Sequence, residues 1–321
     1  MKVCITGASG FIGSNLTEAC LKRGYSVVGI DNLSTGDRNL SDPFRYGRFK
    51  DKYSFVLEDI RNISKIKTVF GGCDVVFHLA ALPRVSFSVD HPIESNDVNV
   101  NGTLCVLQAA SEVGVKRVIF SCSSSIFGGE ADFPTKEDAK PSPKSPYAAQ
   151  KEMGATYCRL YSELYGLDTC SLIYYNVFGK HQKAGSSYAT VIPAFFDAAV
   201  NGTSCRIDGD GNQSRDFAYI DNVVQANILA AEYSGKLDGE RFNIACGESN
   251  SVNDVYNVIC YIFGKTVNKH NAPTRLGDPR KSLADITKAK KILGYEPKIK
   301  FEEGMEKTAE WWRHGCLIKK M

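Results

Sequence analysis

The start of the chain holds a strand, a glycine-rich loop, a helix and a second strand, and this order limits the folds open to it. The β-rich run Lys2–Thr6 leads into the loop Gly7–Gly13, and a helical pattern follows. Gly7 permits a tight turn, Gly10 lets the backbone approach a pyrophosphate, and Gly13 allows the helix to pack closely on the strand. The pattern predicts a dinucleotide site where the first strand ends.

An acidic residue follows the second strand at a place that bears on the choice of dinucleotide. The strand Ser26–Ile30 ends beside Asp31, which stands 18 residues after Gly13. A carboxylate there accepts hydrogen bonds from an adenosine ribose and repels a 2′-phosphate. The spacing therefore favours NAD over NADP.

Further runs rich in β-branched and aromatic residues alternate with helical patterns. The predicted strands are Tyr53–Leu57, Asp74–Leu79, a run opening at Val118, and Thr169–Tyr175. This alternation is typical of a doubly wound parallel sheet, so we expect an α/β fold of Rossmann type. His78, inside an apolar strand, is interpreted as a core histidine.

The pattern changes after Tyr175, where loops rich in Gly and Asp and short strand fragments replace the regular alternation. At 321 residues the chain is also longer than a single core usually grows. We therefore expect an NAD-binding domain of residues 1–175, with 221–245 returning to it. A smaller, interleaved substrate-binding domain takes residues 176–220 and 246–321.

Composition excludes several classes of partner. The formal net charge is only +3 and the basic residues are scattered, which argues against nucleic acid and against an anionic membrane. The eleven cysteines never form a Cys-x-x-Cys pair, so we expect reduced thiols and no metal site. No apolar stretch has the length of a signal peptide or a membrane span, and we expect a cytoplasmic protein.

The stretch from Val118 to Lys151 combines a hydroxyl, a phenol and an ammonium. Its opening strand releases Ser123, Ser124 and Ser125 at the carboxyl end, where open α/β sheets place their ligands. Tyr147 and Lys151 are four residues apart and share one face of a helix. Taken alone, the stretch also fits a serine-rich turn before an ordinary amphipathic helix.

Together these segments resemble the extended short-chain dehydrogenase/reductase superfamily over nearly the whole chain, and specifically its nucleotide-sugar 4-epimerases. Seven motifs carry the resemblance: Gly7–Gly13, Asp31-Asn32, Asp59-Ile60, His78-Leu79-Ala80-Ala81, Asn99-Val100-Asn101-Gly102-Thr103, Ser123-Ser124-Ser125-Ile126-Phe127-Gly128 and Tyr147-Ala148-Ala149-Gln150-Lys151.

The resemblance implies a catalytic triad of Ser124, Tyr147 and Lys151, with Ser123 and Ser125 left open as the hydroxyl. Beyond Tyr147 and Lys151, the implied cofactor-binding residues are Gly7, Gly10, Phe11, Ile12, Gly13, Asp31, Asn32, Asp59, Ile60, Leu79, Ala80, Ala81 and Asn99. Besides Ser124 and Tyr147, the implied substrate-binding residues are Ser86, Ser125, Asn176, Val191, Arg215, Arg275, Asp278 and Ser282. Paired guanidiniums suit a diphosphate.

The implied reaction is NAD-dependent 4-epimerisation of a UDP-hexose. A hydride leaves C4, the 4-keto sugar turns over in the site, and the hydride returns to its opposite face, so that NAD stays tightly bound. Related 4,6-dehydratases and decarboxylases usually carry carboxylates where this chain has Ser123–Ser125. A 4-keto reductase, these two enzyme classes and a non-catalytic NAD-binding protein remain alternatives.

Two finer expectations also follow from the resemblance. Ser282 stands where epimerases restricted to unsubstituted hexoses have a bulky tyrosine, so we expect UDP-GlcNAc and UDP-GalNAc as substrates, and also UDP-Glc and UDP-Gal. Helices over 96–113 and 147–165 match those that pair as a four-helix bundle, which predicts a homodimer.

Overall fold

The main element of the fold is a seven-stranded parallel sheet. A computed structural model of the chain describes residues 1–129, 131–184, 190–274 and 280–318. The strand order is β11-β6-β5-β4-β1-β2-β3, so the glycine loop after β1 and the serines after β5 lie at the same edge. The sheet strands are β1 Lys2–Thr6, β2 Ser26–Asp31, β3 Tyr53–Leu57, β4 Val75–His78, β5 Arg117–Ser123, β6 Asp168–Tyr174 and β11 Glu240–Ile244. The α/β, Rossmann-type expectation is confirmed.

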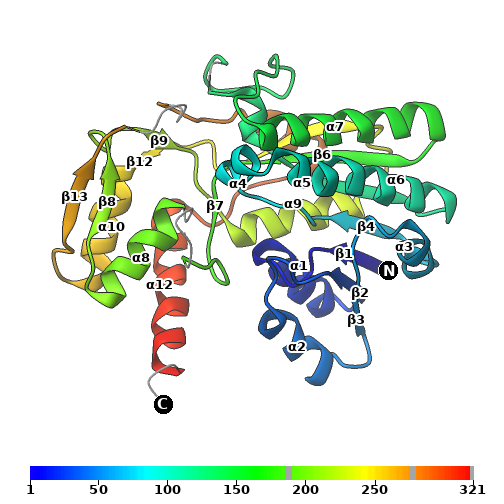
Figure 1. Cartoon of the computed structure of the whole chain (residues 1–321), viewed down its shortest axis with the longest axis horizontal. Coiled ribbons are helices and arrows are strands. Elements are labelled where there is room, and N and C mark those ends of the chain that lie inside the picture. The colour runs from blue at the N-terminus through cyan, green and yellow to red at the C-terminus, as the bar shows by residue number, and fades with distance from the viewer. Residues whose placement is uncertain (130, 185–189, 275–279, 319–321) are drawn as a thin grey trace.

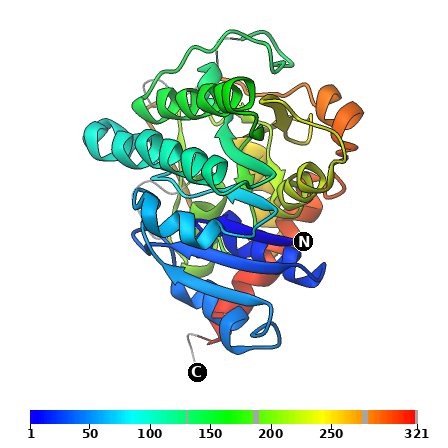
Figure 2. The ribbon, with the colours of Figure 1, turned by 90° about the vertical axis from the view of Figure 1, so that its right-hand side faces the viewer.

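Helices cover both faces of this sheet. One layer contains α3 Ile63–Phe70, α6 Gly102–Glu112 and α7 Pro146–Tyr165, and the other contains α1 Phe11–Lys22, α2 Arg38–Tyr46, α9 Ile220–Glu232 and α11 Thr287–Leu293. Figure 2 shows α6 and α7 side by side above the strands. Strands β1, β4 and β5 are buried on both faces, which explains why they read as nearly continuous apolar runs.

A smaller lobe lies beside the sheet lobe (Figure 1). Its helices are α8 Val191–Asn201, α10 Val252–Phe263 and α12 Phe301–Ile318. Its short strands form three two-stranded pairs: β7 Val177–Phe178 with β10 Ala218–Tyr219, β9 Ser214–Arg215 with β12 Asn250–Ser251, and β8 Cys205–Asp208 with β13 Lys269–Ala272. Figure 1 shows α12 running downward from this lobe to the C-terminus.

The helix that carries Tyr147 and Lys151 has clear local signals. The Ser145 hydroxyl caps α7 by accepting a hydrogen bond from the Ala148 N–H at 3.2 Å, and Pro146 occupies the first turn. Gly166 ends the helix in a left-handed conformation with φ +71°. These signals set the register of α7 and therefore the direction of its functional face.

Two helical details differ from the sequence prediction. The segment 96–113, predicted as one helix, consists of the last residue of α5 Pro92–Asn96, the π-helical segment η1 Asp97–Asn101, and α6. The short helices α2, α3 and α4 Val85–Asp90 were not predicted, because their sequences are polar or short.

Candidate active site

The loop after β1 is a cradle with no room for side chains. Gly7 has φ +72°, and a Cβ added there would lie 2.9 Å from the Ala80 nitrogen. A Cβ on Gly13 would lie 2.0 Å from the Gly7 oxygen, so only glycine lets α1 approach β1 this closely. Gly10 is the N-cap of α1, whose first residues are Phe11 and Ile12. The first backbone N–H groups of this helix therefore point toward the loop. This geometry fits a pyrophosphate.

Asp31 lies at the end of β2, beside the cradle, and is 8% exposed. Its Oδ2 accepts the Ser9 N–H at 2.9 Å, and its Oδ1 accepts the Leu33 N–H at 2.8 Å. Burial raises the pKa of Asp31, while these two N–H groups lower it. Each oxygen retains acceptor capacity, which suits the hydroxyls of an adenosine ribose.

Small residues follow β4 at the next position along the same edge. Leu79, Ala80 and Ala81 are half-buried, and the N–H groups of Leu79 and Ala80 donate to the Thr6 hydroxyl oxygen at 3.1 and 3.2 Å. This anchoring gives a fixed, shallow shelf next to the glycine loop. A flat cofactor fits on it without meeting a long side chain.

The carboxylate of Asp59 is engaged within the protein. Arg61 binds both of its oxygens, at 2.9 and 2.7 Å, and Asn32 donates to it at 3.0 Å. The Arg61 guanidinium lowers the pKa of Asp59 to about 2. Ile60 is buried against Gly102. Through these hydrogen bonds, Asp59 and Asn32 stabilise the loop after β3.

Asn99 was predicted to bind the cofactor, but its side-chain amide is committed to the protein. Its oxygen accepts the Leu82 N–H at 2.8 Å, and its nitrogen donates to the Leu82 carbonyl and to the Gln150 amide oxygen at 3.1 and 2.8 Å. Both N–H donors are therefore used, and the residue is 3% exposed. The structure gives Asn99 a positioning role behind the shelf.

The structure brings Ser123, rather than Ser124, to the phenol of Tyr147. Burial raises the pKa of the Tyr147 phenol, and the nearby Ser123 side chain opposes that rise. The Ser123 oxygen accepts from the Ser125 hydroxyl at 2.9 Å. Strand β5 runs through Ser123, whereas Ser124 is the first residue of the 3-10 turn η2 Ser124–Phe127. The end of the strand therefore decides which hydroxyl meets the phenol.

Lys151 is 4% exposed and lies behind the phenol. Its Nζ donates to the Ser121 carbonyl at 2.7 Å and stands 5.9 Å from the centre of the Tyr147 ring. Burial lowers the pKa of Lys151 to about 8 and raises that of Tyr147. The phenol is thus protonated at neutral pH in the protein alone, and it needs added positive charge to act as a base.

Three residues predicted for the substrate come together from distant parts of the chain. The Asn176 amide donates to the Ser282 hydroxyl oxygen at 3.2 Å, and the Ser282 N–H donates to the Ser214 carbonyl at 3.0 Å. Arg215 neighbours this group in β9 and is half-buried. Asn176 follows Tyr174, the register partner of Ser123, so this group lies beyond the carboxyl ends of β5 and β6.

Asp216 was not predicted as a site residue, yet its side chain joins three backbone segments next to Asn176, Arg215 and Ser282. It is fully buried, and its carboxylate accepts the N–H groups of Cys246, Gly247 and Ala284 at 2.8, 3.0 and 3.2 Å. Burial raises its pKa to about 7 although these N–H groups lower it. An acid preceding the apolar run Phe217–Ile220 is the signal that points to it.

The remaining predicted substrate residues differ in position. Ser86 is exposed on α4, and Val191 is the half-buried first residue of α8. Arg275 and Asp278 lie outside the described residues.

Within the part of the chain that the structure describes, no cluster of three or more His, Cys, Asp or Glu side chains suits a metal ion. Ten of the eleven cysteines have side chains that the structure describes, and all ten have free thiols. None of the described helices is long and apolar enough to cross a membrane.

The comparisons with known proteins agree with this geometry. The chain is 37% identical over 317 residues to a UDP-glucose 4-epimerase of Mycolicibacterium smegmatis, covering 98% of this chain and 99% of that protein. A structure of UDP-glucose 4-epimerase from Thermotoga maritima with UDP-glucose superposes with a TM-score of 0.91 at 35% identity, covering 98% and 100% of the two chains.

A structure of a UDP-N-acetylglucosamine 4-epimerase from Methanobrevibacter ruminantium, in complex with UDP-N-acetylmuramic acid, gives a TM-score of 0.90 at 36% identity and covers 100% and 99%. Residues 3–245 match the model of the NAD dependent epimerase/dehydratase family. With well over half of its length matched, the chain belongs to that family.

Proposed function

We propose that this enzyme catalyses the NAD-dependent 4-epimerisation of a UDP-hexose. The observation that carries the proposal is the placement of Lys151, whose buried ammonium lies 5.9 Å from the centre of the Tyr147 ring, with Ser123 near the phenol at the end of β5. This group stands at the same sheet edge as the glycine cradle and Asp31. Relatives and solved structures named as UDP-sugar 4-epimerases support the same reaction class.

The residues divide the work as follows. When bound, NAD supplies an acceptor for the hydride from the sugar and a donor for its return. The cradle Gly7–Gly13 would hold the pyrophosphate through backbone N–H groups, and Asp31 would hold the adenosine ribose. The shelf Leu79–Ala81 would support the cofactor next to the cradle.

Tyr147 is the group that moves the proton. Its phenol takes the proton of the sugar 4-hydroxyl as the C4–H bond breaks, and Ser123 donates a hydrogen bond to the same sugar oxygen. Positive charge at Lys151 and at the oxidised cofactor favours the phenolate and offsets the effect of burial on the pKa of Tyr147. The proton returns to the oxygen when the hydride returns to C4, so no net oxidation occurs.

The absence of carboxylates at Ser123, Ser124 and Ser125 favours this reaction over elimination or decarboxylation. Eliminating water or losing CO2 requires a further acid or base beside the hydroxyl. Epimerisation needs only proton and hydride transfer at one carbon. The three serines meet that requirement with neutral side chains.

The decisive experiment is incubation of the purified protein with UDP-GlcNAc and no added cofactor, followed by NMR. We expect UDP-GalNAc to appear. A 4-keto reductase would instead require stoichiometric NADH, a dehydratase would give a keto sugar, and a non-catalytic protein would give no product. Tyr147→Phe is expected to abolish turnover while NAD remains bound; full activity in this variant would remove Tyr147 as the base.

We assign the larger lobe, residues 1–175 with 221–245, to NAD and the smaller lobe to the nucleotide sugar. Asn176, Arg215 and Ser282 support the second assignment, because they converge from three separate segments beyond the strand ends. The half-buried hydroxyl of Ser282 occupies little volume there, which supports N-acetylated sugars as substrates. A cytoplasmic location stays a prediction from the sequence.

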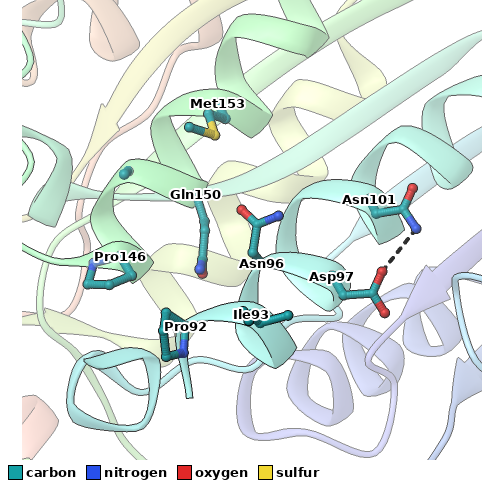
Figure 3. A pocket seen from close by; sticks show the side chains of 9 residues that line it. Pro92, Ile93, Asn96, Asp97, Asn101, Pro146, Gln150 and Met153 are labelled. Atoms are coloured by element: carbon teal, nitrogen blue, oxygen red, sulfur yellow. Dashed lines mark hydrogen bonds between the residues drawn. The ribbon is translucent and has the colours of Figure 1, made fainter. Parts of the chain in front are cut away.

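We also propose that the enzyme is a homodimer through the outer face of α5, η1 and α7. A groove on this face is lined by Pro92, Ile93, Asn96, Asp97, Asn101, Pro146, Ala149, Gln150 and Met153 (Figure 3). Ile93 is 85% exposed, and on α7 Met153 and Leu164 are 47% and 69% exposed. The continuous segment α5-η1 and the helix α7 both expose apolar side chains on this face. They suit the same two segments of a second copy, which would form a four-helix bundle.

A further inference from the structure

A chain of buried polar side chains runs behind the cofactor shelf. It begins at Thr6 in β1 and passes through His78 in β4 to Thr103 in α6. The Thr6 hydroxyl lies 2.9 Å from His78 Nδ1, and His78 Nε2 lies 2.9 Å from the Thr103 hydroxyl. All three residues are at most 1% exposed, so the chain is shielded from water.

Only one arrangement of protons satisfies these contacts. The Thr6 oxygen already accepts two N–H groups from the shelf, so its own proton points to His78 Nδ1. The His78 ring then carries its proton on Nε2 and donates to Thr103. Thr103 in turn donates to the Asn99 carbonyl at 2.7 Å. The hydrogen bonds therefore have a single direction from shelf to η1.

The chain continues from η1 to the catalytic helix. The Asn99 amide holds both backbone polar groups of Leu82 and donates to the Gln150 amide oxygen at 2.8 Å. The Gln150 amide nitrogen donates to the Ser95 hydroxyl at 2.9 Å. Gln150 lies directly before Lys151, and Figure 3 shows its side chain reaching from α7 toward α5 and η1. Each side-chain polar atom of Asn99, Gln150 and Ser95 has a hydrogen-bond partner.

We propose that Gln150 and Thr103 are positioning residues, which hold the turn of α7 bearing Tyr147 and Lys151 in register with the shelf under the cofactor. The inference rests on the proposed function, because it takes Tyr147 and Lys151 as the reacting groups. Both ends of the chain are backbone anchors: the N–H groups of Leu79 and Ala80 at one end, and α5 at the other. A break anywhere along it frees the catalytic turn to shift relative to the shelf.

Two variants break the chain at separate places. Gln150→Met keeps an unbranched side chain of similar length but removes the contacts to Asn99 and Ser95, and Thr103→Val keeps the shape but removes both hydrogen bonds of the hydroxyl. The matched control is Tyr161→Phe, which removes one hydrogen bond between α7 and Gln108 of α6, at 2.8 Å, outside the chain.

We expect Gln150→Met and Thr103→Val each to lower kcat about 10-fold while KM for the nucleotide sugar changes less than about 2-fold, since small displacements of reacting groups act on the transition state. Each variant should also weaken NAD binding by the cofactor-stripped protein, measured by tryptophan fluorescence. The double variant should lose less than the product of the single losses, because both changes break one chain. Tyr161→Phe should leave kcat and NAD affinity unchanged.

Equal effects of Tyr161→Phe and Gln150→Met on kcat and NAD affinity, or single losses that multiply, would overturn the inference. If Gln150→Met does not fold, the comparison of Thr103→Val with Tyr161→Phe tests the inference. Failure of the proposed function is seen separately, as activity that survives in Tyr147→Phe, and the NAD-binding measurements still test the positioning of the shelf in that case.

Discussion

The Ser123 hydroxyl oxygen accepts a hydrogen bond from Ser125 and lies near the Tyr147 phenol, while Ser124 opens the following 3-10 turn. Ser123→Ala is therefore expected to lower kcat about 100-fold, the usual scale for losing one donor to a reacting oxygen. Ser124→Ala should change kcat far less. Steady-state kinetics of the two variants, with thermal melting as a check on folding, decide between the hydroxyls. A larger loss in Ser124→Ala would return the assignment to that residue.

Ser282 is the residue at which substrate size can be tested. Its hydroxyl oxygen accepts from Asn176 and, at 3.4 Å, from the Asp216 N–H, so its position beside the predicted sugar-binding group is well defined. Ser282→Tyr should lower kcat/KM for UDP-GlcNAc at least about 10-fold more than for UDP-glucose, because the larger ring fills the space of the acetamido group. Comparison of the two sugars within one variant controls for folding. Equal losses on both would count against the size argument.

At the scale of elements, the exposed face of α5, η1 and α7 is the feature to test. Ile93→Glu together with Met153→Glu places charges on a proposed apolar interface and should convert a dimer into a monomer. Light scattering coupled to size-exclusion chromatography measures the change. Tyr261→Glu is the matched control, since Tyr261 is 81% exposed on α10 in the other lobe. A wild-type monomer, or a double variant that stays dimeric, would contradict the proposal.

The elements themselves show what the sequence could and could not predict. The strands β1 to β6 were predicted because each is a run rich in β-branched and aromatic residues bounded by turn residues, and β1, β5 and β6 are almost wholly buried. The π-helical segment η1 was not, since its conformation depends on Asn99, whose partners are as distant as Gln150. Ser123 and Ser124 could not be separated because the side-chain alternation ends where the strand does.

Asp216 illustrates the same limit within the smaller lobe. Its three N–H donors come from residues 246, 247 and 284, and no local pattern reveals partners so far along the chain. Burying a carboxylate costs desolvation free energy, so an aspartate is normally expected at the surface. Sequence propensity alone therefore predicts an exposed Asp216. Long-range backbone donors overcome that cost here.

The buried His78 makes the stability of the whole molecule depend on pH. Burial lowers its pKa from 6.5 to about 3, so the unfolded state takes up the proton first as the pH falls. Stability is therefore lost between pH 6.5 and pH 3, and the loss due to His78 amounts to about 2 kcal/mol between pH 7 and pH 5.

Urea unfolding of the wild type and of His78→Gln at pH 7 and pH 5, with the same excess of NAD, isolates this contribution. We expect the advantage of the wild type over the variant to shrink by about 2 kcal/mol at the lower pH, because glutamine does not titrate. An advantage that stays constant between the two pH values would show that His78 is not the responsible group.

Contacts between the lobes hold the molecule together at the cofactor edge. Lys180, after β7, pairs with Glu18 of α1 at 2.9 Å, and Lys183 pairs with Asp37 at 2.5 Å. The His181 ring lies 3.0 Å from the Ser14 hydroxyl and packs on Trp311 of α12. The segment 180–183 therefore links the smaller lobe to α1, to Asp37 and to Trp311.

Strand β11 has a consequence for how the protein is made. It pairs with β6 at the edge of the main sheet, yet it comes from residues 240–244, after the chain has passed through the first part of the smaller lobe. On the ribosome, the N-terminal half therefore emerges with the β6 edge unpaired and open to mispairing. The sheet is completed only when the chain has returned from the other lobe, so a gene fragment ending near residue 175 would encode a sheet with an exposed edge rather than an independent NAD-binding module.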